Sequence, residues 1–372
     1  MKTKKLLFIA AAFAISFICQ NAQAKIWRVN NTSNYNGTTL WGDNLGGTST
    51  NPVFTQLSDA NTSNLVDVNG IDTIHVEGTN IVYNAVTFNR KLIVIGTGYF
   101  LNENPNVSNT VSEAQLQYVV YNTGSEGSQL IGLHVGSSPY GISVNVSNIL
   151  IKRCRIDYNI SVTYNISDVF VLQNHFTNTA NNTSSAILCS PYGFPTNFIF
   201  DNNICKKTLL LSTSATNIYN AEECNNNVFD CPAISGSASI QMNVSSFKNN
   251  ILKTSSATVN INVNVASSNV SNNVSASATN QFGTTNNNIV ITDMSTLFVD
   301  PATNTTDGRY QLKPGSAAGA DGTDRGAFGG LAVSNRYTLS GLAAIPVIYN
   351  INTSGVSGSG GLNVSIKART IK

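Results

Sequence analysis

Residues 198–205 read FIFDNNIC. Two adjacent asparagines, Asn202 and Asn203, stand between an apolar run and another isoleucine, although asparagine is a poor residue for a strand interior. The same pattern of apolar residues around asparagine returns along the chain. It is present in VLQNHF (171–176), CNNNV (224–228), FKNNIL (247–252), NVSNNV (269–274) and TTNNNI (284–289), whereas the related segment LIKRCRI (150–156) has Cys154 in place of the asparagine.

Each of these segments ends on an apolar residue, and the distances between these residues are nearly regular. A period of this length is typical of a coiled chain in which each turn lays strands on the previous turn. The last distance is too short for a complete turn. The residues are Ile156, Phe176, Ile204, Val228, Ile251, Val274 and Ile289, which are 20, 28, 24, 23, 23 and 15 positions apart.

Asparagine stands two positions before most of these apolar residues. A chain that passes from one strand to the next must bend, and asparagine tolerates the left-handed backbone conformation that a sharp bend needs. Stacked bends would bring the side-chain amides into register, where each donates to the next. We therefore predict a buried amide ladder, with the neighbouring Asn203 pointing to solvent. The predicted ladder is Asn174, Asn202, Asn226, Asn249 and Asn272.

Two longer segments resemble parts of a known architecture. DTIHVEGTNIVYNAVTFNRKLIVIGTGYF (72–100) resembles the first turns of secreted right-handed parallel β-helix proteins of pectate-lyase-like architecture, from bacterial cell-surface families. YQLKPGSAAGADGTDRGAFGG (310–330) resembles their closing turn, although Ala317 and Ala318 depart from the usual pattern. The resemblance implies an all-β chain with a single-stranded right-handed parallel β-helix, a solenoid, over residues 71–330.

The first 24 residues are typical of a secretory signal peptide. They combine a lysine-rich start, an apolar run and the small-x-small sequence that ends at Ala24. Cleavage near Ala24 predicts a secreted protein, or one that stays in the periplasm or at the cell surface. It would remove three of the 21 Lys and Arg residues and none of the 19 Asp and Glu residues, so the net charge becomes 18 − 19 = −1.

This composition argues against two classes of partner. The mature chain has no basic stripe for nucleic acid, and no later run is long or apolar enough to be a transmembrane segment. Charged residues make up only 11% of the chain, whereas hydrophobic residues in regular alternation make up 41%, which argues against disorder.

The expected oligomeric state is a monomer.

The segments that flank the coil have their own signals. Residues 25–70 are expected to form an N-terminal cap, with a short helix over 51–60 that begins at Asn51 and Pro52. Residues 331–372 are expected to form a C-terminal β hairpin or tail, because two alternating stretches flank a Gly/Ser-rich turn.

Five cysteines follow the signal peptide, without the spacing of a zinc site. We interpret them as small buried side chains. Export also permits a disulfide, and Cys224 with Cys231 is then the expected pair.

The resemblance places a substrate groove along one strand face, with acidic Ca²⁺ ligands and a basic residue for proton abstraction. Alternation over the corresponding strands predicts that Tyr164 points inward and that uncharged polar residues point outward. Since this face has no carboxylate or base, we expect no cofactor, and Ca²⁺ has no support. The candidate binding residues are Asn145, Thr163, Gln241, Asn243, Asn260 and Asn262.

Two classes of function remain open. The first is a non-catalytic exported protein that binds a polysaccharide or cell-surface glycan, or that has a purely structural role. The alternative is a divergent polysaccharide lyase or glycoside hydrolase, for which Arg153, Asp201 and Lys206 are the weak catalytic candidates. The histidines His134 and His175 are interpreted as solvated side chains.

Overall fold

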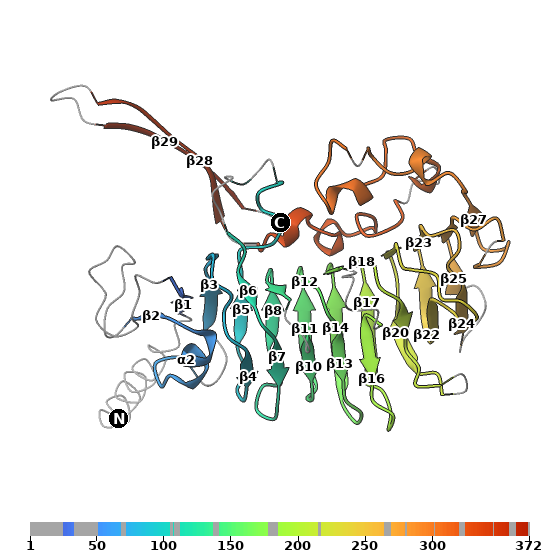
Figure 1. Ribbon diagram of the computed structural model, residues 1–372, viewed down its shortest axis with the longest axis horizontal. Helices are drawn as coiled ribbons and strands as arrows, with labels where there is room; N and C mark the ends of the chain where they lie inside the picture. The colour runs from blue at the N-terminus through green and yellow to red at the C-terminus, as the bar shows by residue number, and fades with distance from the viewer. Residues whose placement is uncertain are drawn as a thin grey trace, which may run out of the picture.

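The structure of the protein is a computed structural model. It describes residues 25–32, 51–67, 72–104, 107, 112–136, 141–177, 185–214, 217–263, 269–279, 281–300, 302–319, 324–344, 346–356 and 362–370. The expected signal peptide lies outside these ranges. The described chain is all-β with almost no helix, and its strands lie side by side along the length of the molecule (Figure 1).

Thirteen strands form the longest sheet, sheet A, in which every pair is parallel. In order across the sheet, it contains β2 (Val53–Phe54), β1 (Ile26–Val29), β3 (Thr73–Val76), β5 (Ile93–Ile95), β8 (Gln129–Ile131), β11 (Ile149–Lys152), β14 (Ser167–Leu172), β17 (Thr196–Asp201), β20 (Asn220–Glu223), β22 (Ile240–Lys248) and β19 (Leu209–Leu210), with β24 (Val259–Val263) and β25 (Val270–Ser271) paired to β22.

Two further parallel sheets complete the body. Sheet B contains β4 (Val86–Phe88), β7 (Val119–Tyr121), β10 (Ile142–Val144), β13 (Ile160–Val162) and β16 (Ile187–Cys189). Sheet C contains β6 (Gln115–Leu116), β9 (His134–Val135), β12 (Arg155–Ile156), β15 (His175–Phe176), β18 (Ile204–Cys205), β21 (Val228–Phe229), β23 (Ile251–Leu252), β26 (Val274–Ser275) and β27 (Ile289–Val290).

The chain visits the three sheets in rotation. Strands β10, β11 and β12 belong to sheets B, A and C, and β13, β14 and β15 repeat this order. Each strand pairs with strands of the neighbouring turns, as β11 pairs with β8 and β14. Alternate residues point inward, so that Ile151, Val171 and Phe200 stack in a fully buried core. Stacked parallel sheets of this kind are compatible with a parallel β-helix.

A ladder of buried asparagine amides follows the bend between sheets A and C. Nδ2 of Asn203 donates to Oδ1 of Asn227 at 3.2 Å, and Nδ2 of Asn227 donates to Oδ1 of Asn250 at 3.0 Å. The main-chain N–H of Asn203 donates to the same Oδ1 of Asn227 at 2.9 Å. The ladder consists of Asn174, Asn203, Asn227, Asn250, Asn273 and Asn288.

This ladder corrects the predicted one by a single position. Asn174 belongs to it, but the other predicted members occupy the bend itself, with φ between 54° and 58°. Asn203 is fully buried, so the expectation that it faces solvent is wrong. The predicted alignment is correct from Ile204 to Val274, and the error was to give the bend and the ladder to the same asparagine. Asn174 was placed with the bend residues because Phe176 pairs with Cys205 and not with Ile204. The displaced residues are Asn202, Asn226, Asn249 and Asn272.

After β27 the chain turns back along the outer face of sheet C (Figure 1). We call residues 294–343 the strap; it contains the short 3₁₀ helices η2 (Met294–Thr296), η3 (Gly308–Tyr310), η4 (Ala317–Gly319), η5 (Val333–Asn335) and η6 (Leu339–Gly341). The segment expected as a closing turn therefore packs against the sheet from outside. Strap residues such as Leu297, Phe298 and Tyr337 share a second apolar core with sheet C residues Ile204, Val228, Ile251 and Val274.

The helix near the N-terminus is shorter than expected and starts later. Helix α2 spans Leu57–Thr62, and its first turn is closed by the Gln56 N–H, which donates to Asp59 at 3.0 Å. Val53 and Phe54 are strand residues instead, because they pair with Arg28 and Val29.

The C-terminal segments form an antiparallel pair, β28 (Pro346–Val356) and β29 (Leu362–Thr370), which extends away from the body (Figure 1). All five cysteines of the described chain are free thiols, so the Cys224–Cys231 disulfide is not formed. Four of them are buried in the core, where burial raises the pKa of the Cys205 thiol to about 12.

Candidate functional site

The outer face of sheet B carries part of the predicted binding surface. Ser143 and Ser161 point outward from the middle of β10 and β13, where they pair with each other in register. Asn145 and Thr163 follow directly after these strands, and Asn145 is exposed. Its Nδ2 donates to Oδ1 of Asn122 on the preceding turn at 3.0 Å. The amides and hydroxyls therefore line up across the turns.

The remaining predicted binding residues lie farther along the molecule. Gln241 pairs in register with Asn260, and Asn243 pairs with Asn262, whose side chain lies outside the described part. Asn243 is only partly available to a ligand, because its Nδ2 donates to the Ile218 carbonyl at 3.0 Å.

A groove of about 520 Å³ runs along the outer face of sheet B. Val120, Ser143, Ser161 and Leu188 form one continuous column of its floor. Gly141 is needed beside this column, because a Cβ there would lie 2.0 Å from the Asn159 carbonyl oxygen. The lining contains no charged residue: it is Tyr118, Val119, Val120, Gly141, Ile142, Ser143, Asn159, Ser161 and Leu188.

Two tyrosines stand exposed beside this face. Tyr192 is 79% exposed and Tyr164 is 40% exposed, and their ring centroids lie 5.5 Å apart. The expectation that Tyr164 points inward is wrong, because β13 ends at Val162 and the chain turns at Asn165, where φ is 57°. Tyr192 was not among the predicted residues, and its position in the turn sequence SPYGFP (190–195) was the available signal.

The three catalytic candidates are not brought together. Arg153 is 4% exposed and lies in the bend, where its Nε donates to Oε1 of Gln173 at 2.8 Å and its Nη1 donates to the Leu342 carbonyl at 2.9 Å. It therefore ties the strap to the body. Lys206 follows β18 in sheet C, and burial and then Arg309 lower its pKa. Asp201 instead ends β17 in sheet A.

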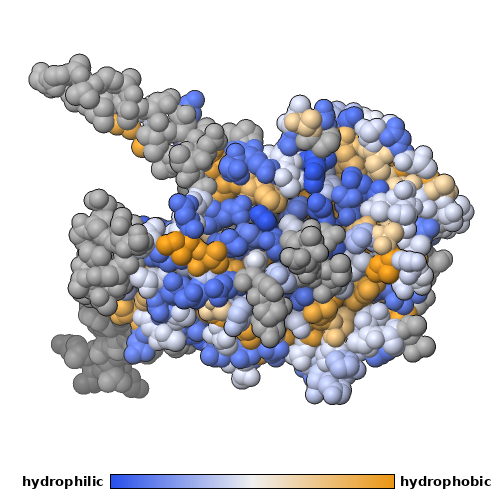
Figure 2. All heavy atoms as spheres, viewed as in Figure 1, coloured by the Kyte–Doolittle hydropathy of each residue, from blue (hydrophilic) through white to orange (hydrophobic). Residues whose placement is uncertain are grey.

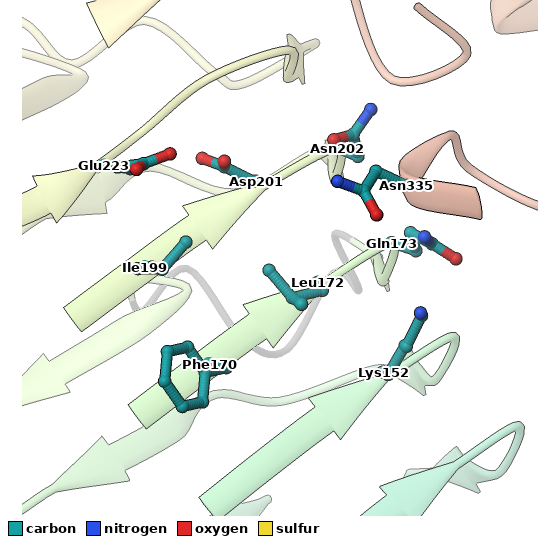
Figure 3. Close-up of a pocket in the computed structure, with 9 residues that line it drawn as sticks. All are labelled: Lys152, Phe170, Leu172, Gln173, Ile199, Asp201, Asn202, Glu223 and Asn335. Atoms are coloured by element: carbon teal, nitrogen blue, oxygen red, sulfur yellow. The ribbon is translucent and has the colours of Figure 1, made fainter. Parts of the chain in front are cut away.

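Asp201 lies in an open pocket of about 200 Å³ beside Glu223 (Figure 3). Asn225 holds both carboxyl groups, because its main-chain N–H donates to Asp201 at 2.6 Å and its Nδ2 donates to Glu223 at 3.0 Å. Burial and the neighbouring Glu223 charge raise the pKa of Asp201 to about 8. The remaining lining residues are Lys152, Phe170, Leu172, Gln173, Ile199, Asn202 and Asn335.

A buried charge network surrounds His134, and the sequence patterns did not predict it. This imidazole is only 5% exposed, and it contacts Glu113 through Nδ1 at 2.9 Å and Asp157 through Nε2 at 2.8 Å. Burial opposes the charged imidazolium, but the hydrogen bond to Asp157 and the adjacent Glu113 carboxylate raise the pKa of His134. Arg155 bonds to Asp157 at 2.9 Å, and the network is a structural tie between successive turns of sheet C. The expectation of a solvated His134 is wrong.

Two absences concern the described ranges alone. Within them, no three His, Cys, Asp or Glu side chains are grouped as metal ligands. In the same residues, no helix has the length and apolar character needed to cross a membrane.

No protein-family model, curated protein or solved structure matches this chain.

Proposed function

We propose that this chain is an exported right-handed parallel β-helix that binds a polysaccharide or cell-surface glycan through the outer face of sheet B. In this proposal the chain is a solenoid, α2 covers its N-terminal end, and residues 1–24 direct export before cleavage near Ala24. The rotation through three parallel sheets and the amide ladder support the architecture. The uncharged groove on sheet B, together with the two exposed tyrosines that follow β13 and β16 of this sheet, carries the functional part.

The groove offers the contacts that a sugar needs. Pyranose rings present apolar C–H faces and hydroxyl edges, so a binding site combines apolar or aromatic surfaces with a few hydroxyl and amide groups. Val120 and Leu188 supply the apolar floor, and Ser143 and Ser161 supply hydroxyls between them. Because the lining carries no charge, the expected ligand is a neutral glycan and not a polyuronate.

Glycan cleavage is not included in the proposal. Arg153 is bonded to Gln173 and the strap, and Lys206 stands on sheet C, so neither joins Asp201 in its pocket. The set of residues that supported the hydrolase or lyase alternative is therefore not assembled.

Binding can be measured by affinity electrophoresis and calorimetry against a panel of neutral and acidic polysaccharides. We expect Tyr192→Ala to weaken retention about fivefold, because an exposed aromatic contact contributes about 1 kcal/mol. Tyr192→Phe should bind like the wild type, since it keeps the ring, and Val290→Ala, on sheet C, serves as the distant control.

The uncharged lining adds a second criterion. Affinity should be the same at about 50 and 500 mM salt, because no ion pair is available to be screened. Retention of no polysaccharide, or binding of polyuronates alone with a steep salt dependence, would contradict the proposal.

A further inference from the structure

The outer face of sheet A carries an apolar patch that opens onto the pocket in Figure 3. Leu150, Phe170 and Ile199 follow one another in register on strands β11, β14 and β17, and all three are half-buried. Leu172 lies beside them in the next column. Figure 2 shows that apolar patches interrupt the otherwise hydrophilic surface on the side turned to the viewer. Contiguous apolar patches on soluble proteins mark interaction sites.

The column through Leu172 has a positive charge at one end and a negative charge at the other. Two such columns that run in opposite directions therefore place opposite charges face to face. Lys152, Leu172 and Asp201 are register partners on three successive strands. Neighbouring strands lie about 4.8 Å apart, so Lys152 and Asp201 are separated by about 10 Å within one chain. They are too distant to form an ion pair with each other, and no salt bridge of Lys152 occurs in the described residues.

We propose that two copies of this chain form a two-fold symmetric dimer through the outer face of sheet A, with Leu172 of both copies at the axis. The two-fold axis runs parallel to the strands, through β14. Each column of one copy then faces the same column of the other copy, so that β14 faces β14 and β11 faces β17. Lys152 of each copy then lies opposite Asp201 of the other. An interface of this kind is isologous, because the same patch serves both copies.

The same rotation also matches the neighbouring column. Phe170 faces Phe170 of the other copy, Leu150 faces Ile199, and Gln129 faces Glu223. No like charges are opposed in either column. The result is an apolar centre with polar groups at its border, which is the usual composition of a protein interface.

The partner copy also supplies an opposite charge to both Asp201 and Lys152. Burial and Glu223 raise the pKa of Asp201, and burial and then Arg153 lower the pKa of Lys152, so each group is poorly placed to hold its charge alone. An opposite charge from the second copy stabilises both ionised forms. The pairing thus gives a role to the adjacent carboxyl groups of Asp201 and Glu223, which have no evident function in the single chain.

The strap borders this face at one edge, where Asn335 lines the pocket. Leu331 is 92% exposed and Val333 is 66% exposed, and they belong to the segment that brings Asn335 to the pocket. Five strands of sheet A bury on the order of 400 Å² per copy, whereas stable interfaces bury about 800 Å² per partner. We therefore expect a concentration-dependent dimer. This proposal departs from the expected monomer.

Sedimentation velocity over about 1–300 µM tests the pairing, because weak dimers form in this range. Lys152→Glu places a second carboxylate opposite Asp201, and Asp201→Lys places a second ammonium group opposite Lys152. Each variant alone should dimerise about 100-fold more weakly than the wild type, because opposed like charges cost several kcal/mol. An equimolar mixture of the two variants should form a heterodimer, and the double variant should regain the homodimer.

Lys367→Glu, on the exposed hairpin, is the control for a change in net charge, and it should dimerise normally. Circular dichroism establishes that each variant is folded. A wild-type chain that stays monomeric throughout, or two single variants that fail to pair with each other, would overturn the proposal and leave this face to a different partner. Neither result would bear on glycan binding, which uses sheet B.

Discussion

Asparagine has two different roles at adjacent positions of one bend. Asn226 has a φ of 54°, so it provides the left-handed turn. Asn227 is fully buried, and its amide bonds to the Phe200 carbonyl at 2.8 Å and to Asn250 at 3.0 Å. The first role depends on the backbone and the second depends on the side chain, so substitutions can separate them.

Asn227→Ala should lower the free energy of unfolding by about 3 kcal/mol or more, because it leaves several buried polar groups without partners. Asn226→Gly should change it by less than about 1 kcal/mol, since glycine adopts a positive φ readily. Urea unfolding curves of the two variants measure both effects. A larger loss for Asn226→Gly would mean that the ladder is not the main polar constraint.

His175 is a buried histidine with an unusual environment. It is 1% exposed, and neither ring nitrogen has a hydrogen-bond partner in the described structure. The Phe100 ring lies 5.3 Å away and the Tyr310 ring 6.4 Å away, by centroids. Burial, and then the nearby Lys206 charge, lower the pKa of His175 to about 3. The expectation that His175 is solvated is therefore wrong.

This environment predicts a loss of stability in acid. Between pH 6.5 and about 3 the unfolded chain binds a proton at His175 that the folded chain does not, so stability falls as the pH falls. His175→Ile introduces the residue type of its register partner Ile204, and it should reduce the loss between pH 6.5 and 4.5 by about 2 kcal/mol. Urea unfolding of both proteins at the two pH values provides the test, and identical losses would contradict it.

At the scale of elements, the strap is the main addition to the three sheets. It covers a column of residues that would otherwise be an exposed apolar stripe on sheet C, and Val228 and Ile251 in this column are fully buried. Hydroxyl groups fix its far end, where Tyr337 bonds to Tyr99 at 2.6 Å. The outer surface of this sheet thus depends on a segment that is distant in sequence.

A chain that ends at Ser295 should therefore expose this stripe, bind the dye ANS and aggregate. A chain that ends at Ala344 lacks only the hairpin and is the matched control, because it keeps the strap. It should neither bind the dye nor aggregate. Equal dye binding by the two truncated chains would show that the strap does not protect sheet C.

Local signals in the sequence identified the parallel-sheet architecture and the left-handed bends. The expected polar outer face is interrupted on sheet B by Val120 and Leu188. Local signals could not show which of two adjacent asparagines enters the ladder, because Asn202 and Asn203 recur together in the same repeated pair. They also could not identify the strap contact. Val228 and Phe229 are both apolar, and alternation alone cannot show that one faces the interior while the other lies under a distant segment.

At the scale of the whole molecule, the two proposed surfaces lie on different sheets. Pairing through sheet A leaves the groove on sheet B open in both copies. A dimer would therefore present two glycan sites in a fixed relation, which increases the strength of attachment to a repetitive polymer without any new contact. Each proposal can still fail without the other.

The strap also limits where this protein can gain repeats by duplication. Its Tyr310 hydroxyl bonds to Asp230 at 2.6 Å, while Ser340 accepts the Tyr99 N–H at 2.8 Å near the opposite end. A repeat duplicated between these anchor points would need a matching insertion in the strap. A repeat added outside them would need none, so growth of this protein by duplication is permitted at the ends and penalised in the middle.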